Sequence, residues 1–337
     1  MIDLIKLTLS NFQGNLDRCE IHRDYKTSIA CRLYNPDKND SAFLYLTFTR
    51  KTKKLQIKGS LRKWYFGSTS YSDLEFCYIN IVILEISKLI GILPEKLHES
   101  MITQCELGLN IKTRIPCEKI IPKISHYGHL KRYEYDGETV GFKGRNKELK
   151  IYDKTNEIIE NNSNTISSLE KMMFKVLKEK GEYFLRIEFT LKDKQSFIQD
   201  DLGNLSTLGG LIQNYSKLYV FLTKEISEIR MSNVIIYDDL MTPIEFLIAR
   251  DINANGFNDT SKSFPNTFKS KTDRGLISAR SKAFLKVCQV LKKYESKKEY
   301  NKNSLLFDIA RKLIIISRTD KTVKLPVLLR NLWGGLH

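Results

Sequence analysis

Three separate segments of this 337-residue chain carry one apolar and one charged face at a period of two residues. They read QCELGLN (104–110), ELKIYDK (148–154) and FLRIEFTLK (184–192). Because side chains alternate across a β-strand, this period predicts strands that bury one face and expose the other. A chain with several such strands is expected to fold around a sheet.

Other segments add strands and helices around these three. Residues 1 to about 70 read as strands separated by turns, because β-branched and aromatic runs alternate with segments such as NPDKND (35–40). Apolar residues at helical spacing predict helices at about 73–90, capped by Ser72 or Asp73, and at 166–181 and 207–230. The order of elements predicts an α+β fold of antiparallel sheets with helices packed on one side, and two similar halves are an open alternative.

Length and cysteine content restrict the remaining possibilities. The chain has room for roughly two domains of about 150 residues, so we expect a domain at 1–255 and a basic, mainly helical C-terminal region at 256–337. No apolar run approaches the ~18 residues of a membrane helix, and no signal peptide is recognisable. The six cysteines lack CxxC spacing, which predicts reduced thiols rather than zinc ligands or disulfides.

The net charge of +16 is concentrated near the C-terminus. From Thr260 onward there are 18 Lys and Arg against 5 Asp and Glu, which places +13 in the last quarter of the chain. A basic segment of this size favours nucleic acid as the partner. Within it, Arg280, Lys282 and Lys286 are candidate contacts to duplex phosphates, with a solvated surface as the alternative.

The charged faces of the three alternating strands carry a set of groups that suits phosphoryl transfer. Glu106 and Glu188 offer carboxylate oxygens, the preferred ligands of a hard divalent metal. Tyr152 offers a hydroxyl nucleophile, and Lys150 and Arg186 offer positive charge for phosphate oxygens. A free tyrosine has a pKa near ~10, so it needs a neighbouring cation or metal to react as phenolate. The simpler alternative is that each strand exposes its polar face to solvent.

A mixed basic and aromatic segment, GSLRKWYFG (59–67), follows one of the predicted strands. Such a mixture suits single-stranded DNA, whose bases stack on aromatic rings while Arg and Lys hold the phosphates. Arg62, Lys63 and Trp64 are therefore candidate DNA contacts. The alternative is a core tryptophan flanked by solvated charges.

At these residues the chain resembles a known family. The segments KGSLRKWYFGSTSYSDLEF (58–76), CELGLNI (105–111), LKIYDKTNE (149–157) and YFLRIEFTLK (183–192) together resemble the gene II/X family of phage and plasmid replication initiation proteins. The order and spacing of the segments match over about residues 50–200. The chain is also similar, more distantly, to rolling-circle plasmid initiators.

The resemblance implies a site-specific single-strand DNA endonuclease and ligase that initiates rolling-circle replication. Its tyrosine attacks the scissile phosphate, becomes linked to the 5′ phosphate and leaves a free 3′ hydroxyl. The implied catalytic residues are Tyr152, Lys154 and Arg186, and the implied ligands of Mg²⁺ or Mn²⁺ are Glu106, Glu157 and Glu188. Other tyrosines remain open as the nucleophile on chemistry alone, namely Tyr65, Tyr127, Tyr133, Tyr135 and Tyr215.

The resemblance also implies a setting for the protein. Residues 1–255 would form the nicking and joining domain, with Lys150 among the DNA contacts and 256–337 as a possible duplex-binding region. The implied partners are single-stranded and duplex origin DNA, with the helicase and polymerase of a bacterial host, in the cytoplasm and away from membranes. A conjugative relaxase of the same chemistry and a non-catalytic DNA-binding regulator remain as alternatives.

Overall fold

The structure is a computed structural model that describes residues 1–38, 42–67, 72–135, 138–160, 168–199, 202–231, 240–255, 260, 282–290, 293 and 302–317. Ten of its strands form one sheet. They are β1 (Ile2–Leu9), β2 (Glu20–Asp24), β3 (Ser28–Tyr34), β4 (Phe43–Thr49), β5 (Lys54–Ser60), β6 (Met101–Thr113), β8 (Lys131–Tyr135), β9 (Thr139–Lys143), β10 (Lys147–Asp153) and β11 (Tyr183–Leu191).

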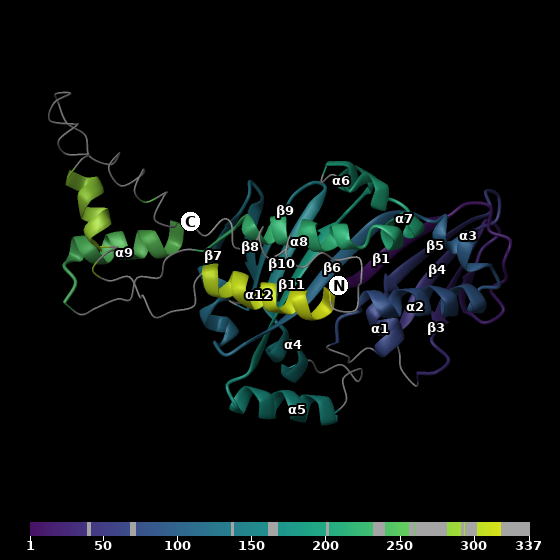
Figure 1. Ribbon diagram of the computed structural model, residues 1–337, viewed down its shortest axis with the longest axis horizontal. Helices are drawn as coiled ribbons and strands as arrows, with labels where there is room; N and C mark the ends of the chain where they lie inside the picture. Colours follow the sequence, from purple (N-terminus) through teal and green to yellow (C-terminus); the bar gives the residue numbers. More distant parts are fainter. Residues whose placement is uncertain are drawn as a thin grey trace.

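The sheet is antiparallel throughout, in the order β2-β3-β4-β5-β1-β6-β11-β10-β9-β8 (Figure 1). Two short strands, β7 (Ile124–Tyr127) and β12 (Ile229–Met231), pair separately. The three segments with alternating polarity are the central strands β6, β11 and β10, which lie side by side. The α+β prediction is therefore confirmed, and the three alternating strands are neighbours within the ten-stranded sheet.

The strand order repeats between the two halves of the sheet. The first half runs β1, β5, β4, β3, β2 outward from the centre, and the second half runs β6, β11, β10, β9, β8. The helices do not repeat, because α1 (Leu61–Phe66) and α2 (Phe76–Leu89) follow β5, whereas α4 (Lys154–Glu160) and α5 (Ser168–Glu179) lie between β10 and β11. The halves are thus similar in strand order alone.

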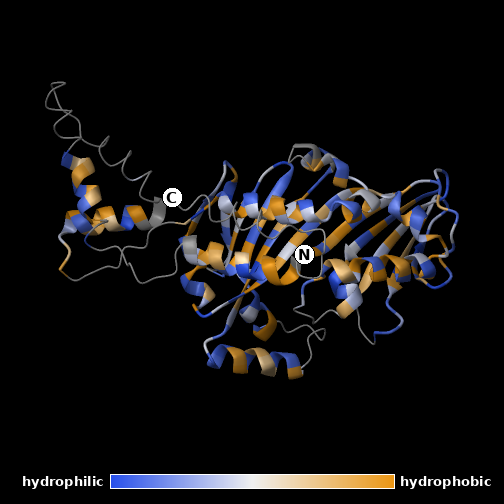
Figure 2. Cartoon of the chain, in the orientation of Figure 1, coloured by the Kyte–Doolittle hydropathy of each residue, from blue (hydrophilic) through white to orange (hydrophobic). Residues whose placement is uncertain are grey.

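Except for α9, the helices that follow bury apolar residues in the main core with the sheet. After α3 (Pro94–His98), they are α6 (Lys194–Gln199), α7 (Leu208–Gln213), α8 (Ser216–Ser227) and α9 (Pro243–Asn255). Phe221 of α8 lies against Phe189 of β11, with 6.3 Å between ring centroids. Apolar residues line the strands behind these helices (Figure 2). None of the helices in the described ranges is long and apolar enough to span a bilayer.

The single helix predicted at 207–230 is wrong, because the chain breaks between α7 and α8. Tyr215 is buried at the break, where its ring lies 5.0 Å from Phe76 of α2 and 5.7 Å from Tyr219. The Asn214 side chain donates a hydrogen bond to the Gly210 carbonyl at 3.0 Å. Aromatic packing with a distant helix therefore overrides a continuous helical pattern.

A helix from the C-terminal region shares the core of the sheet. This helix, α12 (Lys302–Ser317), contacts β6 and α8 and buries Leu305, Ile309, Leu313 and Ile316 in the main core. A second, smaller core joins α9 to residues 282–290. The domain boundary at 255/256 stays a prediction, but part of the chain beyond it stabilises the sheet.

This packing predicts a stability difference between two nearby residues of α12. Ile309→Ala should lower the free energy of unfolding by about 2–5 kcal/mol, because it leaves a cavity in the core. Phe307→Ala is the matched control, since Phe307 is 55% exposed and its loss should cost less than about 0.5 kcal/mol. Urea denaturation of the full chain measures both, and equal effects would contradict the docking of α12.

Candidate active site

The polar faces of the three central strands meet in two adjacent rows across the sheet. Arg186 on β11 stands opposite Tyr152 on β10 and Asn110 on β6. In the next row, Glu188 stands opposite Lys150 and Gly108. The strand register therefore brings together the groups that the sequence places on separate polar faces.

The guanidinium of Arg186 lies at the centre of this arrangement and is 1% exposed. Its Nε donates to Glu188 Oε1 at 3.0 Å, and its Nη1 donates to Asp73 Oδ1 at 3.2 Å. Its Nη2 binds Asp3. Burial alone would lower the pKa of Arg186, but the surrounding carboxylates raise it by more, so the guanidinium remains a cation.

Gly108 makes room for this arginine. The Arg186 side chain crosses the β6 backbone at Gly108, where a Cβ would overlap the guanidinium. Only a residue without a side chain allows the arginine to pass over the strand and reach Asp3 on β1. The glycine within the CELGLNI segment is therefore part of the site.

A β-bulge in β1 places Asp3 on the polar face. Ile2 pairs with Leu107 and Ile5 with Cys105, so that Asp3 and Leu4 both stand opposite Glu106. Bulges of this kind redirect a side chain. Strict alternation would put Asp3 on the buried face of β1, which is why the periodicity did not identify it. The sequence feature that could have identified Asp3 is its position as an acidic residue within the apolar run MIDLIKL.

Two further groups, one basic and one polar, hold the Asp3 carboxylate in place. It accepts a hydrogen bond from the Ser60 hydroxyl, and Arg62 Nε lies 3.3 Å from its Oδ2. Burial alone would raise the pKa of Asp3, but Arg62 and Arg186 hold it well below the usual range. Asp3 is therefore an anion in the folded protein.

Three carboxylates converge beside Arg186. Oxygens of Asp3, Glu106 and Glu188 lie within 4.8 Å of one another. Burial, together with the negative charges of Glu188 and Asp3, raises the pKa of Glu106 to about 8. A cluster of hard oxygen donors with unbalanced negative charge fits a divalent cation such as Mg²⁺ or Mn²⁺.

Tyr152 borders this carboxylate cluster. Its hydroxyl donates a hydrogen bond to Glu188 Oε1 at 2.9 Å. Burial and the negative charges of Glu188 and Glu157 raise the pKa of Tyr152, so the hydroxyl is protonated in the arrangement seen here. The tyrosine thus has a proton acceptor in place, and added positive charge is what its ionisation requires.

The strand carrying Tyr152 changes directly into α4, which positions Lys154 and Glu157. Lys154 Nζ lies 2.5 Å from Glu157 Oε2 and 6.0 Å from the centre of the Tyr152 ring. Burial lowers the pKa of Lys154, although Glu157 opposes this shift. Glu157 was predicted as a metal ligand, but in the structure it pairs with Lys154, and Asp3 is the third member of the carboxylate cluster.

Residues far apart in the sequence complete the charge network. Ser72 or Asp73 was expected to cap α2, but Glu75 occupies that position and Asp73 binds Arg186. Lys312 of α12 lies with its Nζ 2.7 Å from Asp73 Oδ2. No local pattern marks Lys312, because its partner lies on another element.

Two of the predicted DNA contacts are buried in the structure. Trp64 is 1% exposed, and its indole N–H donates to the Leu33 carbonyl at 2.9 Å. Arg62 is 2% exposed and holds Asp3. The alternative of a core tryptophan is correct, because α1 packs against β1 and β4 and buries this part of the segment.

The other predicted DNA contacts have different outcomes. Lys63 and Lys150 are exposed, as is Lys282. Lys286 forms an ion pair with Glu245 of α9 at 3.0 Å. Arg280 lies outside the described residues. Their role in DNA binding stays a prediction.

The comparison with protein families identifies the class of this protein. Residues 6–202, more than half of the chain, match the N-terminal part of the phage replication-associated proteins known as gene II proteins. The chain therefore belongs to this phage replication family, which confirms the resemblance drawn from its motifs. The matched range contains Glu106, Tyr152, Arg186 and Glu188. The comparisons with curated proteins and with solved structures gave no match.

The passage of Arg186 over β6 predicts a large effect of one added methyl group. Gly108→Ala should displace the guanidinium from its buried carboxylates and lower the free energy of unfolding by roughly 3–5 kcal/mol. Gly203→Ala is the matched control, because its added Cβ meets nothing within 4 Å. Chemical denaturation measures both variants, and a Gly108→Ala protein as stable as the control would contradict the geometry.

The raised pKa of Glu106 predicts that metal binding depends on pH. Below about 8 this carboxyl carries a proton, which a metal must displace. The Mn²⁺ affinity should therefore rise by up to about tenfold per pH unit as the pH increases from about 6 toward that value.

Calorimetric titration with Mn²⁺ in buffers of different ionisation enthalpy measures both the affinity and the released proton. Glu106→Gln is the control, because it removes the titrating group and should give weaker binding with a flatter pH profile. Proton release that persists in Glu106→Gln, or an unchanged affinity in that variant, would contradict the carboxylate site.

Proposed function

We propose that this chain initiates rolling-circle replication by cutting and rejoining one strand of origin DNA with Tyr152 as the nucleophile. One observation carries the proposal: the Tyr152 hydroxyl donates a hydrogen bond at 2.9 Å to Glu188, which belongs to a group of three carboxylates that fits a divalent metal. Membership of the phage replication family supports it independently. Asp3, Glu106 and Glu188 would hold the cation, which when bound supplies charge stabilisation at the phosphate oxygens.

In this mechanism the Tyr152 oxygen attacks the scissile phosphorus while its proton passes to the Glu188 carboxylate. The bond between phosphorus and the 3′ oxygen breaks, and that oxygen becomes a hydroxyl by taking a proton from solvent. The 5′ phosphate remains linked to Tyr152. Lys154, next to the ring, contributes positive charge beside the transferred phosphate.

Rejoining follows the same steps in reverse. The 3′ hydroxyl of the displaced strand attacks the phosphate on Tyr152 and releases its proton to solvent, while the bond between phosphorus and the tyrosine oxygen breaks and that oxygen recovers a proton from Glu188. The energy of the original phosphodiester is kept in the protein–DNA bond, so no nucleotide cofactor is needed. Arg186 orients Glu188 through its 3.0 Å hydrogen bond and is a positioning residue in this scheme.

The proposal includes the partners of the reaction. Duplex origin DNA supplies the nick site, the displaced single strand supplies the second substrate, and a host helicase and polymerase in the bacterial cytoplasm extend the 3′ end. A conjugative relaxase would use the same residues, but the match to a phage replication family favours replication.

The nucleophile is tested with oligonucleotides that tile both strands of the replicon encoding this chain. Incubation with Mn²⁺ should yield a protein–DNA adduct that survives a denaturing gel. Tyr152→Phe should abolish it, because the variant lacks only the attacking oxygen. Tyr135→Phe is the control, since Tyr135 is 65% exposed on β8 and should give the adduct at the wild-type level. An adduct that persists in Tyr152→Phe assigns the chemistry to another residue.

A further inference from the structure

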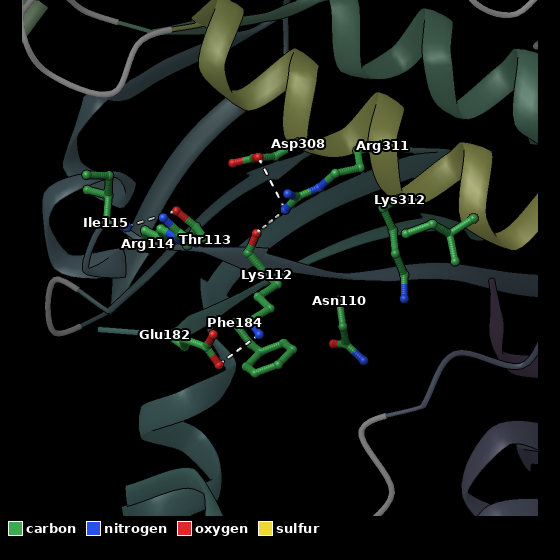
Figure 3. Close-up of a pocket in the computed structure, with 11 residues that line it drawn as sticks. Asn110, Lys112, Thr113, Arg114, Ile115, Glu182, Phe184, Asp308, Arg311 and Lys312 are labelled. Atoms are coloured by element: carbon green, nitrogen blue, oxygen red, sulfur yellow. Dashed lines mark hydrogen bonds and ion pairs between the residues drawn. The ribbon is translucent and has the colours of Figure 1, made fainter. Parts of the chain in front are cut away.

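A cavity of about 660 Å³ lies between the ends of β6 and β11 and the helix α12 (Figure 3). Arg311 and Lys312 extend into it from α12, and Lys112 and Phe184 line it from the two strands (Figure 3). Arg114 adds one further charged group to the wall. Cavities of this size and mixed lining hold small organic groups such as a nucleotide.

The cavity lies on the same polar strand face as Tyr152. On β11, Phe184, Arg186 and Glu188 follow one another at every second residue, and Phe184 pairs with Lys112 of β6. Phe184 and Glu188 are four positions apart on the strand, a distance of about 13 Å at the usual rise. The cavity is therefore within reach of a nucleotide next to a phosphate placed at Tyr152.

The cations of the cavity are only partly neutralised by the protein. Lys112 is paired with Glu182 at 2.7 Å and Lys312 with Asp73 at 2.7 Å. Arg311 is 55% exposed, and within the described residues its contacts are a long 3.7 Å approach to Asp308 and a hydrogen bond to the Lys112 carbonyl. No described residue forms an ion pair with Arg114, which is exposed. Two guanidinium groups are thus available to an anion.

The cavity also offers an aromatic surface. Phe184 is half-buried, with the ring of Phe174 from α5 5.5 Å away. A ring fixed in this way beside two arginines matches the combination that holds single-stranded DNA, in which bases stack on aromatic groups and arginines contact the phosphates.

We propose that this cavity binds a nucleotide of the origin strand next to the scissile phosphate, with Phe184 against the base and Arg114 and Arg311 on the phosphates. The inference rests on the proposed function and extends it, because it names the part of the substrate held outside the carboxylate cluster. It also gives α12, which lies beyond the family-matched range, a direct part in DNA binding.

The test measures binding and does not depend on cleavage. The full chain with Tyr152→Phe is titrated with a fluorescein-labelled thymidine oligonucleotide at several salt concentrations. Arg114→Ala and Arg311→Ala should each weaken binding roughly tenfold, as expected for one charge-assisted contact. Each should also reduce the log–log salt slope by about 0.7, the contribution of one phosphate on single-stranded DNA.

Two controls separate a specific contact from general charge. Lys51→Ala removes one exposed cation from the turn between β4 and β5 and should leave the salt slope unchanged. Arg311→Lys keeps the positive charge and should therefore keep most of the log–log salt slope of oligonucleotide binding. Photocrosslinking with 4-thiothymidine in the oligonucleotide should attach the DNA to the peptide that contains Phe184.

The outcomes distinguish this proposal from the proposed function. If Arg114→Ala and Arg311→Ala bind the oligonucleotide as Lys51→Ala does, the subsite is wrong, even where Tyr152 forms the adduct. If both variants bind the oligonucleotide more weakly with a smaller log–log salt slope, and the crosslink maps to the peptide containing Phe184, the subsite is supported. This holds even where the nucleophile proves to be another residue.

Discussion

Three carboxylates hold the buried guanidinium of Arg186, and they come from β1, β11 and the segment before α2. A buried cation is costly unless each of its donors is matched, so this set of contacts restricts the surrounding chain. β1 needs a bulge to present Asp3, and β6 needs glycine at 108 to let the arginine cross. Both halves of the sheet are thereby joined by one residue as well as by backbone hydrogen bonds.

The same contacts define the site electrostatically. Arg186 neutralises part of the charge of Asp3 and Glu188. Burial raises the pKa of Glu106, and the positive charges of Arg186 and Lys150 offset this increase only in part. The excess negative charge next to the Tyr152 hydroxyl is what a divalent metal would offset. The site therefore has two positions for positive charge. Arg186 is a permanent cation that orients the carboxylates, and a divalent metal, which can exchange, fits among the three carboxylates.

Local periodicity predicted the polar strand faces that meet in the structure. Glu106, Tyr152 and Glu188 lie on polar faces of alternating strands, and neighbouring strands in register bring such faces together. Asp3 could not be predicted, because its orientation depends on a bulge, and Lys312 could not, because it contacts Asp73 only after α12 docks. For Trp64 the sequence left a DNA contact and a core position as alternatives, because its neighbours are basic, and the burial of its ring depends on the packing of α1.

The central claim is that Asp3, Glu106 and Glu188 together form a divalent metal site beside Tyr152. Anomalous diffraction from crystals of the full chain grown with Mn²⁺ tests it most directly. The account predicts one strong anomalous peak among the three carboxylates, with Arg186 still bound to Asp3 and Glu188. A peak at other residues, or the ordered cluster without a peak at saturating Mn²⁺, would contradict it.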